Sequence, residues 1–313
     1  MTTLWVLQHI AAQRDYELRS LDFSTAFLQG RLHEEIWLRR PPGFTESFPA
    51  ALGFAPSTAD PPLFLRTDTS LPPFYVLVYV DEIVFATADT EALTLVKFEL
   101  QKSHTCTDLG ELHSYLGLQI TRDRARRTIT LTQSHMVHQV LQHFGFQFSP
   151  PQPTPLSTSH SLSAPPSDES VEPSGPLLAR VPSQPPGSLR GSRQAPKVVL
   201  TGHADASWVD DSATQRSSQG YTFSLGSGSV SWLSTRSSLV LNSSCEAEIY
   251  AGAMAAQELC WLTYLLIDLG EQPRSPPILY VDNKAMLALC QEHRLEHRTK
   301  HIALRYFLAR ELQ

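Results

Sequence analysis

The sequence contains no run of about 18 apolar residues, the length that a membrane-spanning helix needs. Its N-terminus, MTTLWVLQHIAAQRDYELRS, lacks the basic leader and small-residue cleavage site of a signal peptide. The 4 cysteines lie far apart at positions 106, 245, 260 and 290, and no CxxC pair occurs. We therefore expect the N-terminal stretch to be a helix and not a signal peptide. We also expect an intracellular protein, cytoplasmic or nuclear, with reduced thiols and no membrane partner.

An excess of positive charge is also absent, because 25 Lys and Arg face 31 Asp and Glu, for a net charge of −6. This balance excludes a simple basic clamp for nucleic acid. It still suits an enzyme that holds metal ions with carboxylates, since the ions supply positive charge locally. The chain of 313 residues, 42% of them hydrophobic, is long enough for two domains with separate cores.

Proline is unevenly distributed: about half of the 23 prolines fall in residues 150–196, together with Ser and Gly. Such a segment buries too little apolar surface to offset the entropy lost on ordering. We therefore expect a first domain over 1–149, a disordered linker over 150–196 and a second domain over 197–313. The alternation of strand and helix patterns predicts an α/β (α+β) fold class.

The first candidate site lies in the segment FYVLVYVDEIVFATA, residues 74–88, where two apolar runs meet at Asp81 and Glu82. This pattern predicts a β-hairpin with the acids at its tip. An expected strand over Leu18–Phe23 brings Asp22 to its end. Carboxylates on neighbouring strands could share the divalent cations that phosphoryl transfer needs. The alternative is an ordinary acidic turn and a helix-capping aspartate.

A second set comprises Asp205 in an expected strand, Glu248 near the start of a long helix over 245–268, and Asp282 at the end of a later strand. In an α/β sheet these places converge on one edge, as a two-metal hydrolase requires. Taken singly, Glu248 could instead favour the helix N-terminus, and Asp282 could cap the next helix.

Three blocks in this order resemble the reverse transcriptase of copia-type LTR retrotransposons: LDFSTAFLQGRLHEEIWLRRPPGF, YVLVYVDEIVFATAD and DLGELHSYLGLQI. The resemblance implies a template–primer nucleic acid as substrate, with Asp22 and Asp81 as ligands of the catalytic Mg²⁺ or Mn²⁺ ions and Glu82 beside them. It also implies that Phe27 is the nucleotide-binding aromatic residue that excludes ribonucleotides; a core phenylalanine is the alternative.

Five further blocks resemble the ribonuclease H domain that follows reverse transcriptase in this family: GHADASWVDD, SSQGYTFSLGSGSVSW, SSCEAEIYAGA, LYVDNKAML and HRTKHIALRYFLARE. The implied activity is hydrolysis of the RNA strand of an RNA–DNA hybrid between two Mg²⁺ ions. Asp205 would bridge the ions, with Glu248 and Asp282 each favouring one. We choose Glu248 over Glu246 because the family's acid precedes the helix pattern that begins at Ile249.

The departures from the family matter for activity. Glu82 replaces the last aspartate of the family's YVDD, and only a short Pro/Ala-rich stretch separates Phe44 from the hairpin, where the family has a long helical segment. We therefore expect a truncated palm that does not polymerise DNA. The chain also ends at Gln313, before the family's last strand and helix with a fourth aspartate. Residual ribonuclease H activity is expected at most; the alternative is a degenerate, non-enzymatic relic that binds nucleic acid or protein weakly.

Basic residues give a further set of hypotheses. Arg298, Lys300 and Arg305 could contact the phosphates of a hybrid, or form a solvated helix face. The same two alternatives apply to the basic turn at residues 122–127. Histidines at positions 293, 297 and 301 have helical spacing, which could indicate a zinc site, but His297 and His301 belong to the block that resembles ribonuclease H.

Overall fold

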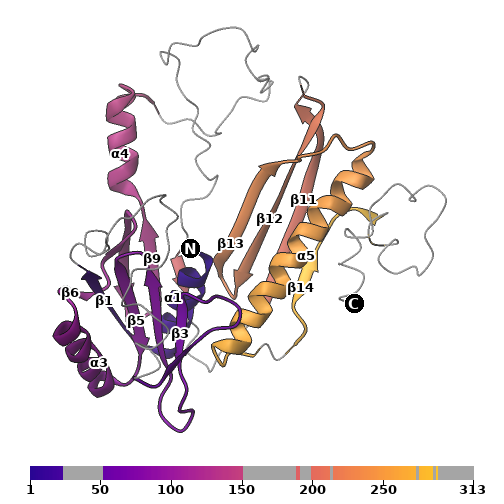
Figure 1. Cartoon of the computed structure of the whole chain (residues 1–313). Helices are drawn as coiled ribbons and strands as arrows, with labels where there is room; N and C mark the ends of the chain where they lie inside the picture. Colours follow the sequence, from indigo (N-terminus) through magenta and orange to yellow (C-terminus); the bar gives the residue numbers. More distant parts are fainter. Residues whose placement is uncertain are drawn as a thin grey trace, which may run out of the picture. The chain divides into compact units, whose positions relative to one another are not determined.

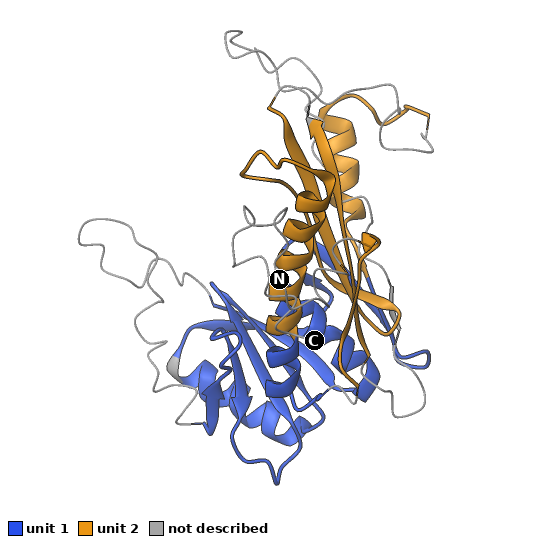
Figure 2. Ribbon diagram, turned by 90° about the vertical axis from the view of Figure 1, so that its right-hand side faces the viewer, with its two compact units in different colours: residues 1–130, 188–198, 263–273 blue, residues 131–187, 199–262, 274–313 orange. Residues whose placement is uncertain are grey.

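The computed structural model describes residues 1–23, 52–150, 188–190, 199–211, 214–272, 275–284 and 287. The chain divides into two compact units (Figure 2): residues 1–130, 188–198 and 263–273 form unit 1, and residues 131–187, 199–262 and 274–313 form unit 2. Residues 263–273 therefore pack with the N-terminal unit, although the sequence pattern assigned 197–313 to one domain. The mixed α/β class is confirmed (Figure 1).

Unit 1 contains a 6-stranded antiparallel sheet in the order β2-β3-β4-β5-β1-β6. Its strands are β1 (Glu17–Phe23), β2 (Phe54–Pro56), β3 (Leu63–Arg66), β4 (Phe74–Tyr79), β5 (Glu82–Thr87) and β6 (Cys106–Glu111). The predicted hairpin is β4 and β5, and the predicted strand that carries Asp22 is β1, which lies beside β5.

Apolar side chains explain why this sheet forms. Phe74 and Phe85 are fully buried in its core, and α3 (Thr90–Ser103) packs against them through Val96 and Leu100. The helix α3 begins where the side chain of Asp89 accepts a hydrogen bond from the amide of Ala92 at 3.0 Å, a regular N-cap. The hairpin acids therefore sit on a rigid, well-packed support.

The first helix, α1 (Thr2–Arg14), is buried on all sides. The predicted N-terminal helix is confirmed, and its polar residues are buried together with its apolar ones. Gln8 and His9 are at most 1% exposed, and burial lowers the pKa of His9 to about 4 because water no longer solvates its charged form.

A second sheet of 4 strands has the order β10-β9-β8-β7. Its strands are β7 (Ser114–Tyr115), β8 (Leu118–Asp123), β9 (Thr128–Thr132) and β10 (Ser188–Arg190), and α4 (Ser134–His143) follows β9. The strand β10 lies within the segment expected to be a disordered linker. It pairs antiparallel with β9, so that expectation is wrong for these three residues.

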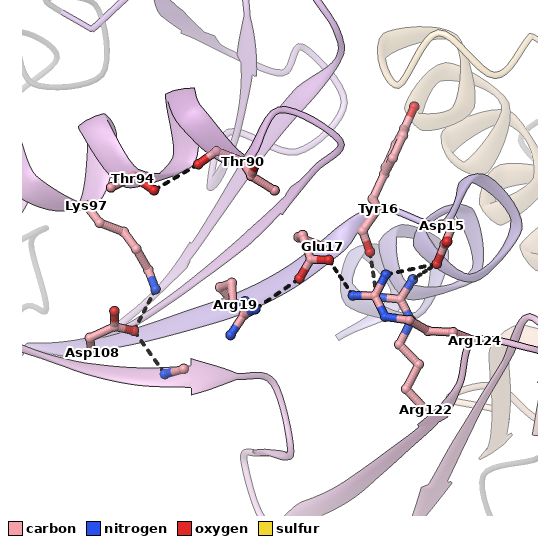
Figure 3. Close-up of polar contacts among 11 residues, drawn as sticks. Asp15, Tyr16, Glu17, Arg19, Thr90, Thr94, Lys97, Asp108, Arg122 and Arg124 are labelled. Carbon is pink, nitrogen blue, oxygen red and sulfur yellow. Dashed lines mark hydrogen bonds and ion pairs between the residues drawn. The ribbon is translucent and has the colours of Figure 1, made fainter.

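The basic turn between β8 and β9 forms internal ion pairs (Figure 3). Arg122 and Arg124 approach the carboxylate of Asp15 at 2.9 and 3.0 Å, and Arg124 also contacts Glu17 at 2.5 Å. Arg127 donates to the backbone carbonyl of Gln13 at 2.9 Å. These three arginines hold the hairpin against the end of α1, whereas Arg126 is 82% exposed and pairs with Asp123 at 3.5 Å.

Unit 2 is built on a mixed sheet of 4 strands in the order β13-β12-β11-β14. The strands are β11 (Leu200–Asp211), β12 (Arg216–Leu225), β13 (Gly228–Arg236) and β14 (Ile278–Tyr280). The pairs β11–β12 and β12–β13 are antiparallel, whereas β14 is parallel to β11. The helix α5 (Ser244–Asp268) covers the face of the sheet that carries Ser231, whose hydroxyl donates to Glu258 at 2.5 Å.

Local capping sets the limits of α5. The hydroxyl of Ser243 accepts from the amide of Glu246 at 3.1 Å, and the Glu246 carboxylate accepts from the amide of Asn242 at 2.7 Å. This reciprocal pattern resembles a capping box. Gly270, with a φ of 69°, lets the chain turn away at the other end. None of the helices in the described part of the chain is long and apolar enough to cross a membrane.

The last turn of α5 and the residues after it are bound within unit 1. The carboxylate of Asp268 accepts from the Ser57 hydroxyl at 2.6 Å and from the Thr58 amide at 2.8 Å. Arg14 donates two hydrogen bonds to the buried Glu271, at 2.8 and 2.7 Å. Polar contacts between residues 210 to 257 positions apart therefore hold Asp268 and Glu271 against the loop after β2 and the end of α1 within unit 1.

Candidate functional site

The hairpin acids meet at one end of the large sheet of unit 1. Asp22 on β1 lies directly opposite Glu82 on β5 in the antiparallel register. Asp81 occupies the turn between β4 and β5, and its carbonyl accepts a hydrogen bond from the amide of Phe23 at 2.8 Å. The fold therefore brings the backbones of all three predicted acids together.

The carboxylate of Glu82 is held by the neighbouring β7–β8 turn. Desolvation, followed by the charges of Asp81 and Asp22, raises its pKa, while a hydrogen bond from the amide of Leu116 opposes this shift. Its Oε2 atom is buried and has no hydrogen-bond partner among the described residues, and the same holds for the hydroxyl of Tyr115. Glu82 is thus partly withdrawn from water beside this turn.

The second set of acids converges more closely. Asp205 comes from β11, Glu248 from α5 and Asp282 from the residues just after β14. One carboxylate oxygen from each lies within 4.8 Å of the other two. Within the described part of the chain this is the one group of three metal-ligating side chains that gathers in this way; the hairpin acids do not.

The topology of unit 2 explains this convergence. The strand β14 runs parallel to β11, and their pairing ends at Tyr280 opposite His203, so the chain reaches Asp205 and Asp282 at the same edge. The helix α5 lies between β13 and β14 in the chain. It begins near this edge, where its first turns carry Glu248. Carboxyl ends of adjacent parallel strands are the usual location of ligand sites in open α/β sheets.

The electrostatics of the cluster favour a cation. Burial raises the pKa of Glu248 to about 7, and the charges of Asp205 and Asp282 add to this effect, whereas a hydrogen bond from the amide of Ala206 opposes it. Glu248 is only 9% exposed, while the two aspartates are exposed to solvent. A divalent cation between these oxygens would relieve their repulsion.

The donor set also fits Mg²⁺ or Mn²⁺. Both ions prefer carboxylate oxygens at about 2.0–2.2 Å, so two oxygens on opposite sides of one ion are about 4 Å apart. Separations of up to 4.8 Å are within a small side-chain adjustment of that geometry. Glu246, the rejected alternative, instead accepts a hydrogen bond from the backbone of Asn242.

Sequence reasoning missed two side chains beside the trio. His203 and Tyr280 stack with their ring centroids 5.0 Å apart and their planes 19° from parallel. Each precedes an acid of the trio by two positions, a spacing that places residues on one face of a strand. Several predicted residues lie outside the described part of the chain: Phe27, His293, His297, Arg298, Lys300, His301 and Arg305.

Comparisons with known proteins define the class. The family model described as reverse transcriptase (RNA-dependent DNA polymerase) matches residues 45–158. The chain is 26% identical to the Retrovirus-related Pol polyprotein from transposon TNT 1-94 of Nicotiana tabacum, with 100% of this chain and 29% of that protein covered. It is 27% identical to the Retrovirus-related Pol polyprotein from transposon RE2 of Arabidopsis thaliana, over 99% of this chain and 26% of that protein.

These matches first assign residues 45–158 to the reverse transcriptases of retrotransposon Pol polyproteins. More particularly, the chain is similar along its whole length to Pol polyproteins of copia-type transposons. It spans less than a third of their length. The alignment with the tobacco protein takes 388 positions for the 313 residues of this chain, so that relative has at least 75 residues within the matched region that this chain lacks.

Proposed function

We propose that the C-terminal unit is a ribonuclease H-like module that hydrolyses the RNA strand of an RNA–DNA hybrid. The observation that carries this proposal is the convergence of Asp205, Glu248 and Asp282 within 4.8 Å. Two-metal hydrolysis of a phosphodiester needs such a cluster of carboxylates at an accessible edge. The resemblance of the surrounding sequence blocks to ribonuclease H supports the same assignment.

Each acid has a distinct task in this proposal. Asp205 would be shared between two Mg²⁺ or Mn²⁺ ions, and Glu248 and Asp282 would each favour one. Bound there, the ions supply positive charge at the scissile phosphate and a reactive water at neutral pH. Burial and the Ala206 amide hold the Glu248 carboxylate in one orientation, while the exposed aspartates leave the site open to a strand of nucleic acid.

We also propose that the reverse transcriptase half does not polymerise DNA. Glu82 stands where the family's second hairpin aspartate would be, and its carboxylate lies against the β7–β8 turn. The 75 or more residues that the tobacco relative has in addition support the loss of a segment that polymerisation needs. Positioned catalysis tolerates very little displacement of its ligands.

The test is cleavage of a labelled RNA–DNA hybrid by the full chain in Mg²⁺ or Mn²⁺. We expect RNA-strand cleavage that EDTA stops and that Asp205→Asn abolishes, while Asp22→Asn leaves it unchanged. Cleavage that persists in Asp205→Asn would assign it to a contaminant and overturn the proposal.

A second candidate function is a non-enzymatic relic that only binds nucleic acid or protein. The observation that favours it is the convergence of only three acids in the described residues, which can hold metal weakly. Hybrid binding without any cleavage at high protein concentration would support this alternative over the nuclease.

A further inference from the structure

The sheet of unit 2 has two faces of different character. The helix α5 packs on one of them, where Phe223 is fully buried and Ser231 contacts Glu258. Side chains alternate along a strand, so the neighbours of these residues point to the opposite face. His203 and Trp232 lie on that opposite face, and both are exposed.

We call this opposite face, which carries His203 and Trp232, the open face. The strand register places four of its side chains in one row. His203 on β11 pairs with Tyr280 on β14 and with Thr222 on β12, and Thr222 in turn pairs with Trp232 on β13. Tyr280 is 50% exposed and Trp232 is 40% exposed. Adjacent strands are about 4.8 Å apart, so the row from Tyr280 to Trp232 measures about 14 Å. This length accommodates two or three nucleotide bases.

The open face differs chemically from a surface that a helix would cover. Buried sheet faces are mostly aliphatic. Among the positions that the register assigns to the open face, only Ile278 is aliphatic. The other positions carry hydroxyls, aromatic rings, a glycine, two exposed arginines and the carboxylate of Asp205: Thr201, His203, Asp205, Ser207, Arg216, Ser218, Gly220, Thr222, Ser224, Ser229, Trp232, Ser234, Arg236 and Tyr280. Rings stack on bases, and arginine and hydroxyl groups bind phosphates.

We propose that this open face binds a single-stranded segment of nucleic acid. One base stacks on the ordered Tyr280–His203 pair and another on Trp232, while Arg216 and Arg236 contact phosphates. Four-stranded sheets with exposed aromatic side chains bind single strands in this way elsewhere. Asp205 lies two positions from His203 on the same strand face, so a bound strand passes beside the acidic trio. The binding itself requires neither metal nor hydrolysis and is thus separable from the proposed nuclease.

The first experiment measures fluorescence anisotropy of fluorescein-labelled 12-nucleotide oligo(U) and oligo(dT) with the full chain in EDTA. Loss of one stacking partner is expected to raise Kd about 5- to 100-fold. We expect this for Tyr280→Ala and for Trp232→Ala, with a smaller rise for Trp232→Phe. The matched control is Tyr264→Ala on α5, which removes a tyrosine that is 62% exposed outside this face.

A second measurement changes the nucleic acid in place of the protein. An abasic strand of 12 phosphates should bind the wild-type chain as weakly as the stacking variants bind oligo(dT). Arg236→Ala should reduce the slope of log K against log salt by about 0.7, the value for one phosphate contact on a single strand. Equal binding of abasic and normal strands, or equal loss in Tyr264→Ala, would overturn the proposal.

The nuclease proposal and this one fail in different ways. Glu248→Gln, on α5 and outside the open face, should lose hybrid cleavage but keep its affinity for the single strand. If the wild-type chain cleaves nothing yet binds oligo(dT) through Tyr280 and Trp232, the open face still stands as a binding site. If it cleaves hybrids but all aromatic variants bind single strands normally, only the open-face proposal is lost.

Discussion

The two acidic sets start from similar sequence signals but end with different geometry. Asp22 and Glu82 are opposite each other on paired strands, and Asp81 precedes Glu82 directly. Consecutive side chains around a strand end point in different directions, so adjacency along the backbone does not gather their oxygens. In the second set each acid comes from a different element, and the three oxygens meet. Convergence therefore depends on the direction of approach more than on proximity in sequence.

The electrostatic environments differ in the same sense. Burial raises the pKa of both Glu82 and Glu248, but Glu248 is the more deeply buried and its pKa reaches about 7. A hydrogen bond from the amide of Leu116 holds the Glu82 carboxylate to the β7–β8 turn. The Glu248 carboxylate instead faces those of Asp205 and Asp282. Glu82 is thus partly shielded from water, whereas Glu248 is in position to share a cation with the two aspartates.

The largest expected effect is on the rate of hybrid cleavage, which should depend on Glu248 but not on its neighbour Glu246. Glu248→Gln should reduce hybrid cleavage about 100-fold or more, because it removes a charged ligand that faces the two aspartates. Glu246→Gln is the matched control and should stay within about 3-fold, since Glu246 only caps the helix. Initial rates on a labelled hybrid in Mn²⁺ measure both. Equal losses in the two variants would contradict the assignment.

Metal binding should distinguish the two sets directly. Mn²⁺ at about 100 times its Kd should raise the melting temperature of the wild-type chain by about 5 °C. Asp282→Asn should lose this rise, and Asp81→Asn should retain it. Differential scanning fluorimetry with and without EDTA measures the shift. If the Mn²⁺-induced rise in melting temperature were lost in Asp81→Asn instead, the metal would bind at the hairpin.

In metal-free buffer the two glutamates should give pH effects of the same sign and different size. A folded-state pKa above the unfolded value means that stability falls as pH rises through that interval. For Glu248 the interval runs from 4.5 to about 7. The melting temperature of the wild type relative to Glu248→Gln should therefore fall between pH 4.5 and 7.5.

The corresponding fall relative to Glu82→Gln should be smaller, because Glu82 is less buried. Thermal melts at several pH values, with EDTA throughout, provide the measurement. A flat difference for Glu248→Gln would mean that the carboxylate cluster does not form in solution.

The smallest expected effect is none at all. Glu82→Asp restores the acid of the family's hairpin motif, but the residues that the tobacco relative has in addition remain absent. Primer extension on an RNA template should therefore give no product with the wild type or with Glu82→Asp. Extension by either protein would show that the hairpin acids can still act, and would remove the contrast between the two sets.

Much of the local structure could be predicted from residue patterns. The β-branched and aromatic runs around Asp81 predicted the β4–β5 hairpin, and the long helix expected over 245–268 is α5. The burial of Gln8 and His9 could not be predicted, because neighbouring elements surround α1 on the side that its polar residues suggested was solvated. The strand β10 was missed because its pairing with β9 outweighs a local composition that favours disorder.

By itself the sequence determined the β4–β5 hairpin, the long helix α5 and the identity of the acids, since such local patterns extend over a few residues. Only the tertiary structure decided which acids meet, where the arginines of the β8–β9 turn bind and how Asp268 is fixed to Ser57. These outcomes depend on side-chain directions across strands and on contacts between residues up to 257 positions apart. Local patterns carry no information on such directions, because one strand signal is compatible with several neighbours and registers.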